Sequence, residues 1–172
     1  VRRQAGTVVT IGACATSGGI QSLRNWGRHE DFLRCVYAKP EYISSLATST
    51  AIADHVRVDY ELRGCPVNRH QLLDVILTLA AGRKPRLPVH SVCMDCKRRG
   101  TVCVEVARGI PCLGPITQTG CGAICPSFDR GCYGCFGPAQ QANCESLTDH
   151  LLDTGSTPDS LLPLLRNFNG AA

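Results

Sequence analysis

The sequence lacks several features that would point to common classes of protein. It has no run of about 18 apolar residues, so no membrane span is predicted. Aromatic residues make up 5% of the 172 residues. No nucleophile stands in a recognisable pattern with a base, which argues against a catalytic site carried by this chain alone. The formal net charge of +4 is mild and mostly scattered, so nucleic-acid binding is not predicted either.

The N-terminus shows no leader pattern. Arg2-Arg3 is followed by Gln4-Ala5-Gly6 where a secretory signal would place a long apolar segment, so no signal peptide is predicted. The first expected strand begins only a few residues after Val1. We therefore expect part of the natural N-terminus to be absent from this sequence.

Cysteine is the residue in excess, with twelve in the chain. Eight lie within one stretch bracketed by two CxxC pairs: Cys93, Cys96, Cys103, Cys112, Cys121, Cys125, Cys132 and Cys135. Eight thiols make two sets of four, and four thiolates suit either a cubane iron–sulfur cluster or a structural zinc. A disulfide framework is disfavoured because apolar stretches elsewhere can build a core. The spacing matches neither zinc ribbons nor the bacterial ferredoxin run, and modestly favours iron–sulfur.

Two further cysteines follow expected strands. Residues 7–11 are β-branched and lead into Cys14, and alternation over 56–62 leads into Cys65. Open α/β sheets place ligands beyond the carboxyl ends of their strands. By itself Cys14 is better explained as a small buried core residue. Two strand-end cysteines in one sheet nevertheless suggest a shared site.

The remaining elements follow from helical signals. Residues 20–26 can open a short helix, and Asn68 can cap a longer one that Gly82 ends. Residues 28–50 are expected to form a loop, with a short helix near 42–46. Two short helices are expected over 146–152 and 157–168, and the last four residues, 169–172, are expected to fray.

Four motifs in order carry a family resemblance: IGACATSGGI at 11–20, GCP at 64–66, CLGPIT at 112–117 and CYGC at 132–135. They resemble the small, electron-transferring subunit of nickel–iron hydrogenases. The similarity is strongest to the cytoplasmic type linked to NAD(P) or deazaflavin, including the sulfhydrogenase delta subunit, and extends over residues 7–138. Related complex I subunits, of the NADH dehydrogenase 20 kDa type, share the Cys14 and Cys65 motifs but lack the eight-cysteine segment.

The resemblance implies ligands for three 4Fe–4S clusters. The implied proximal ligands are Cys14 and Cys65; the distal ligands are Cys93, Cys96, Cys103 and Cys112; the medial ligands are Cys121, Cys125, Cys132 and Cys135. His90 is an alternate distal ligand or a hydrogen-bond donor beside it. Cys125 stands where periplasmic relatives have proline and a 3Fe–4S cluster, which implies a 4Fe–4S cluster here. The family's N-terminal CxxC is absent, so two or three clusters are implied.

The resemblance also implies the architecture. Residues 1–86 would form a partial flavodoxin-like parallel α/β sheet with helices, and residues 87–145 an irregular cysteine-rich domain that binds two clusters. Residues 146–172 would form a C-terminal helical tail.

The implied function is that of an oxidoreductase complex in the cytoplasm. This chain would relay electrons without being catalytic, while the nickel–iron centre would lie in a large-subunit partner. A flavin- or iron–sulfur-bearing subunit would be the second partner, and the basic run 97–99 could dock it. The alternatives are a zinc-stabilised structural or interaction module and a complex I-type iron–sulfur subunit.

Overall fold

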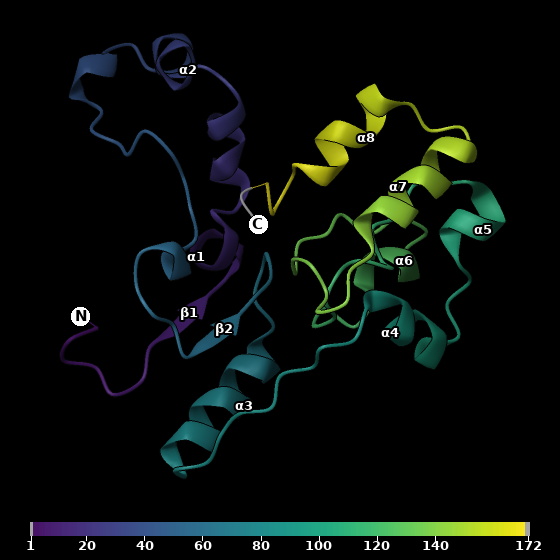
Figure 1. The fold of residues 1–172 in the computed structure, drawn as a ribbon, viewed down its shortest axis with the longest axis horizontal. Coiled ribbons are helices and arrows are strands. Elements are labelled where there is room, and N and C mark those ends of the chain that lie inside the picture. The colour runs from purple at the N-terminus through teal and green to yellow at the C-terminus, as the bar shows by residue number, and fades with distance from the viewer. Residues whose placement is uncertain (1, 171–172) are drawn as a thin grey trace.

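The computed structural model describes residues 2–170 and contains a two-stranded parallel sheet (Figure 1). Strand β1 (Val9–Ile11) pairs with β2 (Tyr60–Leu62). Both predicted strands are present and parallel, as an α/β fold requires, but each is shorter than expected. The ladder ends upstream because the Asp59 carboxylate accepts the Val8 N–H at 2.9 Å and the Arg2 guanidinium at 2.6 Å. Both hydrogen bonds lower the pKa of Asp59, and the bond from the Val8 N–H has the larger effect.

Short helices fill the connection between the two strands. They are α1 (Ala13–Ser17), η1 (Ile20–Trp26), α2 (His29–Val36), η2 (Pro40–Tyr42) and η3 (Ile52–Asp54). The expectation of a loop over residues 28–50 is wrong at α2. This helix buries no residue, although Phe32, Leu33 and Val36 form a short apolar stripe that stays largely exposed. Glu30 and Arg34 stand 3.8 Å apart at i,i+4, which supports an exposed helix.

Helix α3 (Arg69–Ala80) follows β2 and joins the two halves of the molecule. Asn68 caps it as predicted, accepting from the backbone N–H groups of His70 at 2.9 Å and Gln71 at 3.4 Å. The other end of the Asn68 side chain donates to the carbonyl of Gly120 at 2.5 Å. The cap therefore also ties α3 to the cysteine-rich segment.

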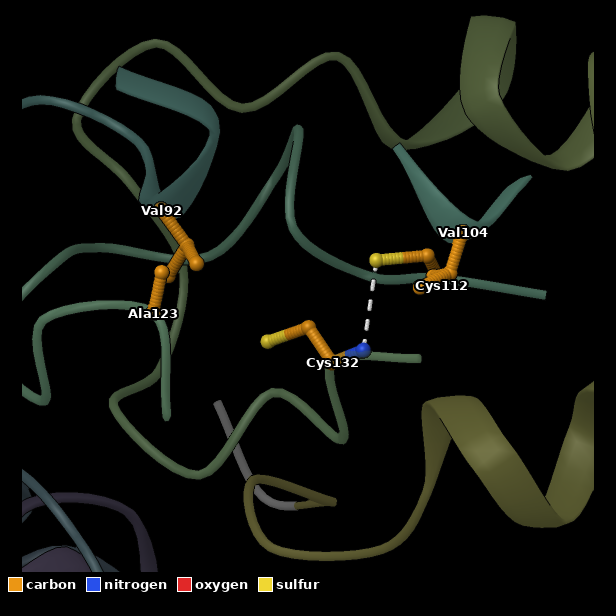
Figure 2. Close-up of a cluster of buried hydrophobic side chains, with 5 residues drawn as sticks. All are labelled: Val92, Val104, Cys112, Ala123 and Cys132. Atoms are coloured by element: carbon orange, nitrogen blue, oxygen red, sulfur yellow. Dashed lines mark hydrogen bonds between the residues drawn. The ribbon is translucent and has the colours of Figure 1, made fainter. Parts of the chain in front are cut away.

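The cysteine-rich segment is built from three short helices and irregular loops. They are α4 (Val92–Arg99), α5 (Val104–Arg108) and α6 (Ile124–Ser127). Its core consists of Val92, Val104, Cys112, Ala123 and Cys132, all buried (Figure 2). Two of the five core side chains are thiols, so cysteine packs here where other proteins place aliphatic residues.

The tail forms helices α7 (Cys144–Asp153) and α8 (Pro158–Leu165), close to their expected bounds. Their leucines pack on Leu113 and Ile116 of the cysteine-rich segment. The expected fraying is wrong for Asn169, whose Oδ1 accepts from Ser17 Oγ at 2.7 Å; residues 171–172 lie outside the described residues. Among residues 2–170 no helix has the length and apolar character to cross a membrane.

Leu62 closes β2 immediately before the Cys65 loop, with 1% of its surface exposed. We expect Leu62→Ala to lower the free energy of unfolding by roughly 2–5 kcal/mol, because it leaves a cavity beneath the sheet. Leu77→Ala, at a position 67% exposed, is the matched control and should change little. Denaturant titrations of both variants measure the difference, and equal midpoints would contradict this placement of the core.

Candidate metal-cluster site

Cys93, Cys96, Cys103 and Cys112 gather around α4 and α5. The first two lie one turn apart on α4, Cys103 caps α5, and Cys112 lies in the loop that follows. Burial, followed by repulsion from Cys112, Cys96 and Cys103, raises the pKa of Cys93 to about 11. The four cysteines that the family resemblance implies as the distal set are thus neighbours, and Cys96 also lies near Cys121 of the other implied set.

Gly114 leaves an open place beside two of these sulfurs. A Cβ at this position would stand 3.3 Å from Cys112 Sγ and 3.5 Å from Cys93 Sγ. The Gly114 N–H donates to Cys112 Sγ at 3.4 Å. Without a side chain, the backbone can approach the sulfurs directly, as it does around iron–sulfur clusters, where such bonds tune the potential.

The predicted medial cysteines are also neighbours, although Cys132 lies between the two groups. Burial raises the pKa of Cys135 to about 11, and Cys121 and Cys125 add repulsion. Burial raises the pKa of Cys132 to about 12, and the neighbouring thiols Cys112 and Cys135 act in the same direction, while the Gly134 backbone and the Thr117 side chain oppose the rise. The Cys132 N–H donates to Cys112 Sγ at 3.2 Å (Figure 2). This bond joins the two predicted groups.

These thiols fit an iron–sulfur cluster by their chemistry. Buried thiols with raised pKa values are protonated at neutral pH, so a metal must displace the protons and supply the positive charge that the surroundings lack. The backbone N–H groups of Gly114 and Cys132 already donate to Cys112 Sγ. Within residues 2–170, no three Cys, His, Asp or Glu side chains converge closely enough to hold a single metal ion.

Cys14 and Cys65 lie at the carboxyl ends of β1 and β2. The loops run together because Gly12 N–H donates to the Leu62 carbonyl at 2.7 Å. Both thiols are exposed, so the explanation of Cys14 as a buried core residue is wrong. A Cβ on Gly19, whose φ is +61°, would stand 2.7 Å from Cys14 Sγ, so only glycine fits there.

His90 faces the polar side of α4. Its Nε2 lies 3.3 Å from Asp95 Oδ1 and 3.2 Å from Arg98 Nη1, and the Thr119 hydroxyl also donates to Asp95. Within the basic run, Arg99 donates to the Gly122 carbonyl beside Cys121. Two of the three basic residues therefore have partners inside the chain.

Sequence reasoning missed one link between the halves of the molecule. Asn169 accepts from Ser17 and donates to the carbonyl of Gly134, between Cys132 and Cys135. Nearby, the Arg166 guanidinium lies 3.8 Å from the centroid of the Trp26 ring, a cation–π arrangement. No motif marks either contact, because each joins residues far apart in sequence.

Comparison with known proteins shows what the chain is similar to. Residues 1–79 match the family "NADH ubiquinone oxidoreductase, 20 Kd subunit". Sulfhydrogenase 2 subunit delta of Pyrococcus furiosus is 33% identical over 87% of this chain and 62% of its own length. A vhu subunit of the F420-non-reducing hydrogenase of Methanocaldococcus jannaschii is 32% identical over 94% and 63%. A chain in the solved structure of an NAD⁺-reducing [NiFe]-hydrogenase in the H2-reduced state is 32% identical, with a TM-score of 0.44 over 51% of this chain and 56% of that one.

The predicted resemblance is confirmed. Residues 1–79 match the 20 kDa subunit family of NADH ubiquinone oxidoreductase, and the α/β fold agrees with that match. The chain as a whole is a homologue of hydrogenase subunits. It spans a little under two thirds of the length of these two relatives.

We expect Gly114→Ala to reduce metal loading, because its methyl group would occupy the place beside the Cys93 and Cys112 sulfurs. The iron content of Gly114→Ala should fall below that of the parent protein by the iron of one cluster. Gly6→Ala, where a Cβ meets nothing within 4 Å, is the control. Iron and acid-labile sulfide assays on anaerobically purified protein make the measurement. Equal iron content in both variants would show that this place is not part of a cluster site.

Proposed function

We propose that this chain is the electron-transfer subunit of a nickel–iron hydrogenase complex, with iron–sulfur clusters at its three cysteine groups. The observation that supports this most is the presence, in a homologue of hydrogenase subunits, of two four-thiol groups beside a pair of strand-end thiols. When bound, such clusters supply one-electron redox centres. The chain's own contribution is to space, insulate and tune them.

The order of the three groups is supported by backbone contacts between them. The Cys65 backbone and thiol lie close enough to Cys135 to influence its pKa, and the Cys132 N–H donates to Cys112 Sγ. The cysteines of the medial group therefore lie beside both of the other groups. This arrangement suits a relay in which the Cys65 end and the Cys93 end are the two outer stations.

Burial insulates the inner part of this series. Cys112 and Cys132 are 6% and 5% exposed, and apolar residues enclose them, so water has little access. N–H donors to the sulfurs stabilise negative charge and so raise the reduction potential of a bound cluster. Cys14 and Cys65, by contrast, are exposed. We infer that the large subunit, which would hold the nickel–iron centre, covers this end.

The second partner would meet the chain near the Cys93 group. Lys97 extends from the last turn of α4 beside these thiols, and a flavin- or iron–sulfur-bearing subunit with an acidic surface would complement it. Asp95 offsets part of the charge of Arg98, and a bond to the Gly122 carbonyl holds the Arg99 side chain against the chain. The proposed complex works in the cytoplasm.

A complex I-type subunit is a second candidate, favoured by the family match of residues 1–79. It needs only the Cys14 and Cys65 end of the series. The eight other thiols, of which Cys112 and Cys132 are buried, have no use in it. The hydrogenase interpretation accounts for both parts of the chain and is preferred.

Hydrogen itself tests the proposal. In the natural complex, purified without oxygen, H2 should bleach the visible absorption of the clusters on this chain and produce the electron paramagnetic resonance signals of reduced clusters. Dithionite serves as the positive control for reducibility. Clusters that dithionite reduces, but that H2 leaves oxidised, would contradict a role in hydrogenase electron transfer.

Cys125 tests the assignment of the medial group. We expect Cys125→Ala to convert a 4Fe–4S cluster to the 3Fe–4S form, because one iron loses its thiolate, and to raise the reduction potential. Cys144→Ala, an exposed cysteine outside the groups, is the matched control. Paramagnetic resonance of the oxidised protein separates the two forms. A Cys125→Ala spectrum identical to that of Cys144→Ala would refute the assignment.

A further inference from the structure

The Phe136 ring is enclosed by the backbone of two glycines. Its side chain is 3% exposed, and its ring lies between Gly64 and Gly120, which come from distant parts of the chain. A Cβ on Gly64 would stand 2.5 Å from Phe136 Cζ, and a Cβ on Gly120 would overlap the opposite edge of the ring. No residue larger than glycine fits on either side while the ring keeps its place.

Each backbone that touches this ring carries a cysteine at the next position. Gly64 precedes Cys65, Gly120 precedes Cys121, and Phe136 itself follows Cys135. One side chain therefore contacts the loops of a proximal cysteine and of two medial cysteines. A ring with two rotatable angles, packed along two opposite edges, holds such loops at a fixed separation better than a flexible aliphatic chain can.

Polar contacts fix the same loops from outside. Asn68 Nδ2 donates to the Gly120 carbonyl at 2.5 Å, and Arg63 Nη1 donates to the Pro138 carbonyl at 3.0 Å. These bonds hold the segments that flank Phe136 against the end of β2 and the start of α3. The position of the ring is thus determined by both halves of the molecule.

We propose that Phe136 is a positioning residue that fixes the Cys65 thiol against the Cys121 and Cys135 thiols, and so sets the electronic coupling between the clusters they bind. This inference rests on the proposed function. The step concerned is the loss of one electron by one iron–sulfur cluster and its gain by the next, with no bond made or broken. Its rate depends on separation and on the packing between the two centres, which are the properties that Phe136 controls.

Phe136→Leu tests the proposal in the natural complex. Iron and sulfide content should stay at the parent value, because no ligand is changed. The magnetic interaction between the two reduced clusters, seen as splitting in low-temperature paramagnetic resonance, should be lost or broadened because the loops are no longer held at one separation. Phe128→Leu, at a position 73% exposed in the same segment, is the control and should keep the splitting.

Gly120 provides a second, independent test. Gly120→Ala should also weaken the splitting, because its methyl group displaces the ring. In the double variant with Phe136→Leu the shorter side chain makes room for that methyl group, so the added effect of Gly120→Ala should be smaller than in the parent. An equal effect of Gly120→Ala in both backgrounds would overturn the proposed contact.

The outcomes distinguish this inference from the function on which it rests. A parent complex with clusters, but with identical splitting in Phe136→Leu and Phe128→Leu, overturns the role of Phe136 and leaves the proposed function intact. A parent complex without iron–sulfur signals overturns both. If the Phe136→Leu protein cannot be produced, the splitting in Gly120→Ala is compared with that in the parent. An unchanged splitting overturns the role of Phe136, and a reduced splitting supports it.

Discussion

Burial of thiol groups is the constraint on which the cysteine-rich half of this protein depends. Cys112 and Cys132 occupy a core with Val92, Val104 and Ala123, where the charged form of a thiol is strongly disfavoured. Burial raises the pKa of Cys132 to about 12. Thiolates in such surroundings need a positively charged group among them, so folding and metal binding in this segment are coupled. The small number of aliphatic residues in this core is consistent with a metal as its main stabilising component.

Backbone rather than side chain surrounds the sulfurs. Gly114 and Gly19 leave room beside Cys112 and Cys14, and the N–H groups of Gly114 and Cys132 donate to Cys112. Donors held by the backbone do not reorganise when the charge at the sulfur changes, which favours rapid electron transfer. The same use of bare backbone places Phe136 between two glycines. The three cysteine groups are thereby joined into one series by short-range contacts.

Much of this could be predicted from the sequence, for identifiable reasons. The strand-end positions of Cys14 and Cys65 followed from β-branched and alternating runs, and the cap at Asn68 followed from local chemistry. Spacing alone left iron and zinc open, and the division of the eight cysteines came from the family resemblance. Helix α2 was missed although Phe32, Leu33 and Val36 give it an apolar stripe, because the helix spans only eight residues and its stripe packs on no core. The contacts of Phe136 and Asn169 could not be predicted, because they depend on how distant loops meet.

The metal content of the chain tests the central claim most directly. After anaerobic purification, iron, zinc and acid-labile sulfide should be measured together with the visible spectrum. Two clusters in the segment between Cys93 and Cys135 require at least about eight iron and eight sulfide per chain, in a brown protein. A colourless protein with about two zinc ions and no sulfide would contradict the relay and establish a structural metal module instead.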